Sequence, residues 1–124
     1  MRTAGQPPLV TAGRAWHGAG MKKPALVRPD WDTYFMNIAR VVATRSNCSS
    51  RQVAAVIVHD HRIISTGYNG TPRGVRNCFE GGCPRCAAKK ASGTALDECI
   101  CCHAEENAIT QASFHGIALR GATL

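Results

Sequence analysis

Near its C-terminal end the chain carries the stretch Cys101-Cys102-His103-Ala104-Glu105-Glu106-Asn107-Ala108-Ile109. The pattern predicts a helix from about His103 to Phe114, which Gly116 would stop. In mid-helix, His103 and Glu105 would point away from each other, because residues two positions apart do not share a helix face. The two side chains can converge only if His103 is the helix cap, and the cysteines before it favour that position.

An imidazole and a carboxylate arranged in this way suit metal-assisted hydrolysis. Zinc lowers the pKa of a bound water to about 7, and imidazole is one of its usual ligands. A carboxylate beside that water can take its proton and pass it on. We therefore predict that His103 binds a catalytic zinc and that Glu105 carries the proton. The alternative is a histidine that only caps the helix beside a solvated glutamate.

Seven cysteines precede or adjoin this histidine. Their odd number, the Cys-x-x-Cys spacing of Cys83-Pro84-Arg85-Cys86 and the nearby histidine favour metal over disulfides. One tetrahedral zinc takes four ligands, so the six plausible thiols exceed the need of one site: Cys48, Cys78, Cys83, Cys86, Cys99 and Cys101. A redox pair and buried free thiols are the alternatives, but no helix pattern follows Cys86 as it would in a redox motif. Cys102 is expected to be a spare buried thiol.

The upstream half predicts one helix packed on a β-hairpin. Asp30 has the character of an N-cap, and apolar residues recur at helical spacing from there to about Arg45. Most of these apolar residues should be core: Trp31, Tyr34, Phe35, Ile38, Val41 and Val42. Two apolar, β-branched runs, Val53–Val58 and Ile63–Thr66, flank a polar turn and predict the hairpin.

From Gly67 to about Cys101 the sequence is typical of a loop. Such a length is unusual for a structureless connection, so we expect bound metal to order it. The basic residues Arg85, Lys89 and Lys90 would screen the charge of several thiolates on one metal. The last residues, 121–124, predict the beginning of a further strand.

The size and charge of the chain restrict its class. Its 124 residues suit one small domain. The net charge is +7, but residues 1–30 hold five basic residues and one acid, so the remainder is only mildly basic. This balance suits a small phosphate-bearing ligand better than nucleic acid. No apolar run approaches the roughly 20 residues of a membrane span, and no secretory signal is evident, which predicts a cytoplasmic protein without membrane contact.

Residues 1–29 are rich in Gly, Ala, Pro and Arg and lack periodicity. We interpret them as a disordered or spurious N-terminal extension. An organellar transit peptide and a natural start at Met21 are the alternatives.

Taken together, these residues resemble the deoxycytidylate (dCMP) deaminase family, within the cytidine and deoxycytidylate deaminase superfamily. The resemblance runs from about Trp31 to Leu124. Five motifs occur in the order of the family: Trp31 to Met36, Arg45 to Cys48, Ile63 to Pro72, Gly82 to Cys86 and Cys101 to Ile109.

The resemblance implies an α/β fold with three layers, α/β/α, around a mixed five-stranded sheet. It implies zinc-dependent hydrolysis of dCMP to dUMP and ammonia, a step of pyrimidine deoxynucleotide metabolism. His103 matches the catalytic zinc ligand of the family, Glu105 its proton shuttle and Asn69 a nucleotide-contacting position. Members are often homo-oligomers regulated by dCTP and dTTP. Some carry a structural zinc, for which Cys48, Cys78, Cys86 and Cys101 match by position, with Cys83 and Cys99 as rivals.

One departure from the family is plain. Zinc deaminases have a Pro-Cys-x-x-Cys after the His-x-Glu pair, and none follows within this chain. Cys83-Pro84-Arg85-Cys86 cannot replace it, because it precedes His103 and has its proline between the cysteines. We therefore interpret residues 30–124 as the N-terminal part of a deaminase domain, in a fragment, a prematurely stopped chain or a misread gene. The alternatives are a non-catalytic cysteine-rich zinc module and a deaminase of another base or nucleoside.

Overall fold

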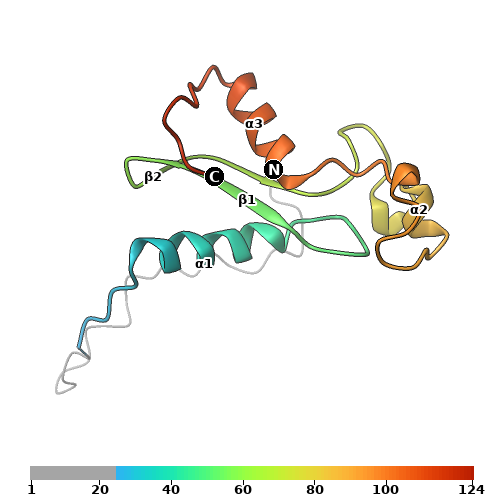
Figure 1. Cartoon of the computed structure of the whole chain (residues 1–124), viewed down its shortest axis with the longest axis horizontal. Helices are drawn as coiled ribbons and strands as arrows, with labels where there is room; N and C mark the ends of the chain where they lie inside the picture. Colours follow the sequence, from blue (N-terminus) through green and yellow to red (C-terminus); the bar gives the residue numbers. More distant parts are fainter. Residues whose placement is uncertain (1–24) are drawn as a thin grey trace, which may run out of the picture.

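The computed structural model describes residues 25–124. The prediction for residues 1–29 therefore lies almost entirely outside the described residues. Two helices, α1 (Trp31–Ala43) and α3 (Ala104–Phe114), enclose a hairpin of β1 (Ala54–His59) and β2 (Arg62–Tyr68). Figure 1 shows α1 and α3 on opposite sides of the hairpin. This α/β/α layering confirms the predicted fold class, of which the described residues supply two antiparallel strands.

The hairpin has the geometry that its polar turn predicts. Strands β1 and β2 pair antiparallel, with His59 opposite Arg62. The two turn residues, Asp60 and His61, both have positive φ, 48° and 58°, as a two-residue turn of the type that matches strand twist requires. The register shifts between Ile57 and Val58, which is a β-bulge.

Helix α1 begins as predicted and ends slightly early. The Asp30 carboxylate accepts a hydrogen bond of 2.7 Å from the backbone N–H of Thr33, which confirms it as the N-cap. The helix ends at Ala43, two residues before the expected Arg45.

The expectation that the apolar residues of α1 are mostly core is wrong. None of the helix residues is fully buried, and Trp31 and Val41 remain 45% and 69% exposed. The reason is that α1 packs on only two strands, which present too narrow a surface to cover its apolar side. Trp31 still finds one close partner, since its ring lies parallel to that of His61 at 4.3 Å.

Helix α3 packs closely on the other face of the hairpin. Its buried face is made of Ala104, Ala108 and Ala112, and the first two join Ala55 and Ile57 in the core. Small side chains let the helix backbone approach β2, where Ser65 Oγ donates to the carbonyl of Ala108 at 2.7 Å.

The C-terminal end of α3 is as predicted. Gly116 has a φ of +66°, and the N–H of Ile117 donates to the carbonyl of Ala112 at 2.9 Å, a glycine-based helix stop. Further on, Thr123 and Val58 exchange two backbone hydrogen bonds of 2.8 Å. The expected further strand is thus present as a single antiparallel bridge to β1.

The long segment between β2 and α3 is more regular than a loop. It contains the short helices η1 (Cys78–Glu80), α2 (Pro84–Ala87) and η2 (Leu96–Glu98). The single turn of α2 lies within the Cys-x-x-Cys pair, with Cys83 as its N-cap, and it ends at Ala87, so no longer helix follows Cys86. Proline at the first helical position needs no hydrogen-bond partner for its nitrogen and starts this single turn. Among the described residues, no helix is long and apolar enough to cross a membrane.

Candidate metal centres

His103 lies at the cap of α3. Its backbone is extended, with φ −72° and ψ 153°, and the helix proper begins at Ala104. The Glu106 carboxylate accepts a hydrogen bond of 3.0 Å from the backbone N–H of His103, which fixes this geometry. The predicted cap position is confirmed, whereas the role of His103 as a metal ligand stays a prediction.

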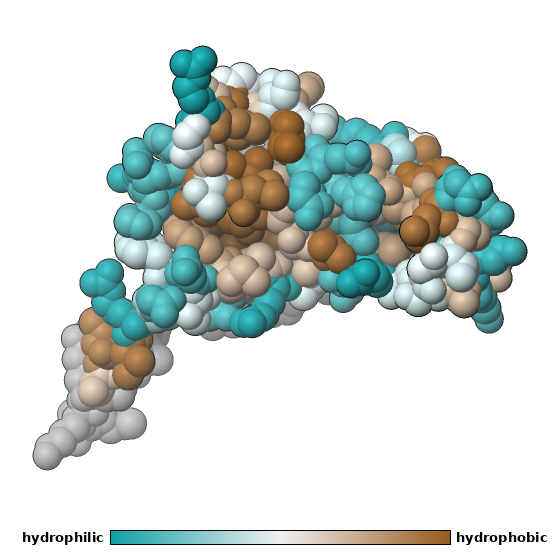
Figure 2. All heavy atoms as spheres, in the orientation of Figure 1, coloured by the Kyte–Doolittle hydropathy of each residue, from teal (hydrophilic) through white to brown (hydrophobic). Residues whose placement is uncertain are grey.

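Glu105 follows in the first turn of α3 and faces a hollow of the molecule. It lines a cavity of about 720 Å³ together with side chains of α1, strand β1 and the C-terminal residues Thr123 and Leu124. Apolar residues gather over the hairpin between α1 and α3 on the face that Figure 2 shows. A charged carboxylate beside such a surface is placed to act on a ligand there.

The donors at this site suit zinc but do not complete its coordination. His103 would contribute one of the four ligands of a tetrahedral site. Among residues 25–124, each group of three or more possible ligands within reach of one metal consists of cysteines and excludes His103. Three further donors would be needed at His103.

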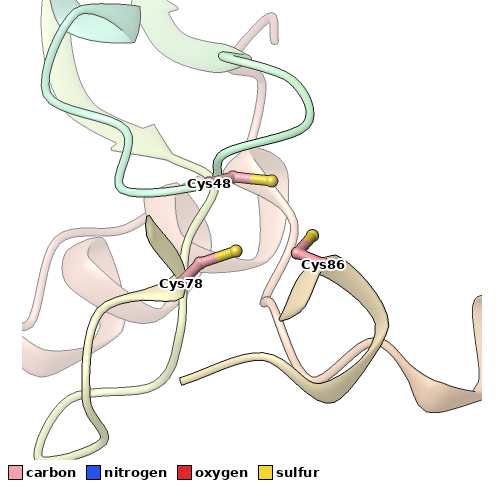
Figure 3. A group of neighbouring side chains, drawn as sticks. All are labelled: Cys48, Cys78 and Cys86. Carbon is pink, nitrogen blue, oxygen red and sulfur yellow. The ribbon is translucent and has the colours of Figure 1, made fainter. Parts of the chain in front are cut away.

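The cysteines, in contrast, converge from distant parts of the chain. Cys48, Cys78 and Cys86 come from the loop after α1, from η1 and from α2, and their sulfur atoms lie within 4.8 Å of one another. Figure 3 shows the three side chains directed toward a common point. Thiolates from three separate segments around one point form a typical ligand set for zinc.

A second group lies beside the first. Cys78, Cys83 and Cys101 also lie within 4.8 Å of one another, and the sulfur of Cys99 is 3.8 Å from that of Cys83. All six thiols that the sequence singles out are therefore gathered. The expected set divides, since Cys101 is grouped with Cys83 rather than with Cys48 and Cys86. Cys102 belongs to neither group and is half-buried, not buried as expected.

Hydrogen bonds explain why these loops meet. Asn47 Nδ2 donates to Asn77 Oδ1 at 2.8 Å, and its Oδ1 accepts from the N–H of Thr71 at 3.0 Å. The carbonyl of Asn47 also accepts from the N–H of Phe79 at 3.1 Å. This side chain thus joins the Cys48 segment to the Cys78 segment. Asn47 lies in the motif from Arg45 to Cys48, but sequence reasoning gave it no role of its own.

Arg85 organises the other side of the cluster. Its guanidinium is buried and donates from Nε to the carbonyl of Thr94 at 2.8 Å and from an Nη to that of Ala91 at 3.1 Å. The residue expected to screen thiolate charge therefore also fixes the loop that leads to Cys99.

The packed thiols differ in proton affinity. Burial raises the pKa of Cys83, but hydrogen bonds from the backbone of Cys86 and Ile100 and from neighbouring thiols outweigh it and lower the pKa to about 6. Burial and the sulfur of Cys78 raise the pKa of Cys86 to about 12. Burial and the nearby sulfurs, Cys78 first, likewise raise the pKa of Cys101. Neighbouring thiolates repel one another, so full ionisation of the cluster requires a cation between them.

Asn69 has its side-chain amide engaged within the protein. Its Oδ1 accepts from Ser46 Oγ at 2.6 Å and from the N–H of Val53 at 2.9 Å. Its Nδ2 donates to the carbonyl of Arg51 at 2.9 Å. The amide therefore anchors the loop after β2, and the predicted contact of Asn69 with a nucleotide stays a prediction.

Comparisons with known proteins agree with this arrangement. Residues 29–124 match the family described as the cytidine and deoxycytidylate deaminase zinc-binding region. A deoxycytidylate deaminase of Schizosaccharomyces pombe is 54% identical over 94 residues, which cover 76% of this chain and 29% of that protein. One of Saccharomyces cerevisiae is 55% identical over 87 residues, 70% of this chain and 27% of the relative. The chain thus spans less than a third of the length of these two fungal relatives.

A solved structure is similar over most of the described fold. The dCMP deaminase of the cyanophage S-TIM5, crystallised with dCMP and dUMP, superposes with a TM-score of 0.57 at 26% identity. The match covers 78% of this chain and 64% of the phage chain. Since the family match extends over most of the chain and includes both the capped His-x-Glu helix and the cysteine cluster, this chain belongs to the cytidine and deoxycytidylate deaminase family.

Proposed function

We propose that this protein hydrolyses dCMP to dUMP and ammonia with the help of zinc. The observation that carries the proposal is the cap of α3, where the extended backbone of His103 precedes Glu105. The relatives named deoxycytidylate deaminase and the dCMP-bound phage structure support the choice of substrate.

The chain's own residues have defined tasks in this proposal. His103 donates one ring nitrogen to the metal. Zinc, when bound, supplies a water that attacks at neutral pH. With zinc bound, the carboxylate of Glu105 would take one proton from the water and deliver it to the ring nitrogen. It would then take the second proton, from the hydroxyl group added to the ring, and deliver it to the amine, which leaves as ammonia. The loop that Asn69 anchors lies against the nucleotide.

Replacement of Glu105 by glutamine tests the proposal. Glu105→Gln keeps the size of the side chain but removes the proton acceptor, so ammonia release from dCMP should fall by at least about 100-fold while zinc content is unchanged. The assay uses the longest natural protein that carries residues 31–124, loaded with zinc. Glu98→Gln, at an exposed residue of η2, is the matched control and should keep full activity. Undiminished turnover by Glu105→Gln would refute the assigned role.

The substrate class is tested separately. We expect turnover of dCMP and little of deoxycytidine or cytosine, because the mild positive charge of the domain suits a phosphate-bearing ligand. Equal rates with and without the 5′-phosphate would assign the protein to another deaminase type. We also propose that dCTP and dTTP act as effectors of a homo-oligomer. A change in the dCMP saturation curve on adding either nucleotide would support this, and an unchanged curve would contradict it.

The cysteine cluster is proposed to bind structural zinc, with ligands drawn from the two groups that share Cys78. We also propose a cytoplasmic location, where thiols stay reduced and available to a metal. A second candidate function follows from the same cluster, because it forms without His103. A non-catalytic zinc module would show bound zinc at the cysteines, no ammonia release and no effect of Glu105→Gln on partner binding.

A further inference from the structure

We propose that the cysteine cluster holds two zinc ions that share the thiolate of Cys78. This inference rests on the proposed zinc binding by the cluster and is independent of the proposed deaminase activity. It assigns a ligand role to each of six thiols, whereas a single structural zinc would use four of them.

The grouping of the sulfur atoms carries the inference. Two sets of three thiols each lie within 4.8 Å, and Cys78 is the member common to both. With Zn–S bonds of about 2.3 Å, two sulfurs on one tetrahedral zinc lie about 3.8 Å apart. The sulfur–sulfur distances within each set are therefore close to those expected around one zinc ion. The six sulfur atoms do not all surround a single point.

The second set has a fourth ligand at hand. The sulfur of Cys99 lies 3.8 Å from that of Cys83, which is the spacing expected for two thiolates on the same zinc. On this contact we assign Cys99 as the fourth ligand of the ion at Cys78, Cys83 and Cys101, although Cys99 is not part of the group that lies within 4.8 Å. Cys78 and Cys83 are almost fully buried, so this ion is enclosed.

The first set opens onto solvent. Cys78 and Cys86 line a cavity of about 750 Å³ together with Ser49, whose Oγ lies 3.7 Å from the sulfur of Cys78. The ion held by Cys48, Cys78 and Cys86 therefore completes its shell with an oxygen ligand from this side.

Charge on the cavity wall is compatible with two ions, although four thiolates on one zinc would leave the same formal charge. Six thiolates and two divalent ions leave a formal charge of about −2, as in other thiolate-rich zinc sites. Lys89, Lys90 and Arg85 all line the cavity beside the first ion, and Arg85 lies between the two cysteines of the Cys-x-x-Cys pair. These three cations offset the excess negative charge.

Metal stoichiometry tests the inference on the wild-type cluster. The chain carrying His103→Ala, which removes the separate histidine site, is reduced, loaded with zinc and measured by native mass spectrometry. We expect two zinc ions per chain. Loading with ¹¹³Cd should give two cadmium resonances that are spin-coupled to each other, because a shared thiolate connects the nuclei.

Serine substitutions test which thiols bind which of the two ions. Cys48→Ser and Cys99→Ser should each leave one tightly bound ion, and each should remove a different cadmium resonance. Cys78→Ser should abolish the coupling and weaken both ions. Cys102→Ser is the matched control, since this thiol belongs to neither group, and it should keep two coupled ions.

The outcomes separate the proposals. A single ion in the reduced wild-type cluster would overturn the two-ion inference and leave the structural zinc intact. Two uncoupled resonances would overturn the sharing of Cys78. No bound ion would overturn both proposals for the cluster, while the deaminase proposal is decided independently by Glu105→Gln.

Discussion

Gly67 is a residue whose lack of a side chain positions α3. A Cβ at this point of β2 would overlap the carbonyl oxygen of Ala104 and the backbone nitrogen of Ala108. The close approach of strand and helix places the cap of α3, and with it His103, at the end of the hairpin. The geometry of the proposed catalytic site therefore depends on a glycine outside it.

We expect Gly67→Ala to lower the free energy of unfolding by about 1–3 kcal/mol, or to shift α3, because the added methyl group overpacks a backbone contact. Urea denaturation measures the loss. The comparison is Gly93→Ala, where nothing lies within 4 Å but φ is +77°, so only backbone strain of about 1 kcal/mol applies. A smaller loss for Gly67→Ala than for Gly93→Ala would contradict the close packing.

A second prediction for a single residue concerns Asn69. Asn69→Ala removes three internal hydrogen bonds and should lower the free energy of unfolding by about 1–3 kcal/mol. Asn37→Ala, on exposed α1, should change it by less than about 0.5 kcal/mol. If Asn69→Ala weakens dCMP binding with no loss of stability in the same denaturation assay, the residue serves the ligand rather than the loop.

Among the helices and strands, some features are determined by the local sequence and others are not. The caps of α1 and α3, the hairpin turn and the stop at Gly116 depend on neighbouring residues, and the sequence predicts them. The exposure of α1 depends on how many strands lie beneath it, which no local pattern contains. The grouping of the thiols involves Asn47 and Arg85, which bind distant loops, and no local pattern contains these contacts. The resemblance therefore supplied one set of four cysteines, whereas the structure shows two groups that share Cys78.

The N-cap of α1 leads to a prediction of how thermal stability depends on pH. The N–H of Thr33 holds the pKa of the Asp30 carboxyl below its ordinary value, so the cap stabilises the fold above the unfolded pKa of about 3.9. That contribution is lost as the pH falls through the lower folded pKa. We expect Asp30→Ala to lower Tm at pH 7 and to differ little from wild type at about pH 2. A Tm difference that is constant between these pH values would contradict a charged cap.

In the whole molecule, two parts of the chain are stabilised by different kinds of interaction. The hairpin and α3 are joined by apolar packing, whereas the segment from residue 70 to residue 102 contributes mainly short helices and cysteines. The bridge between Gly70 and Cys102 closes this segment at its base. The proposed metals therefore stabilise one half more than the other.

Removal of metal should unfold that segment first. On chelation under reducing conditions, we expect amide exchange to accelerate at Phe79 and throughout residues 70–102, while the amides of β1 and β2 stay protected. Hydrogen exchange with and without zinc measures both regions in one sample. Uniform acceleration across both halves, or none in residues 70–102, would contradict the division.

The parallel contact between Trp31 and His61 has a practical consequence. It joins the first turn of α1 to the tip of the hairpin through one pair of rings, so the indole's emission depends on whether that helix is docked. With Trp16→Phe, Trp31 is the single tryptophan of the chain. The wavelength and lifetime of its emission, excited selectively, would then report release of the helix. The protein thereby carries its own optical probe on the side of the hairpin away from the thiols.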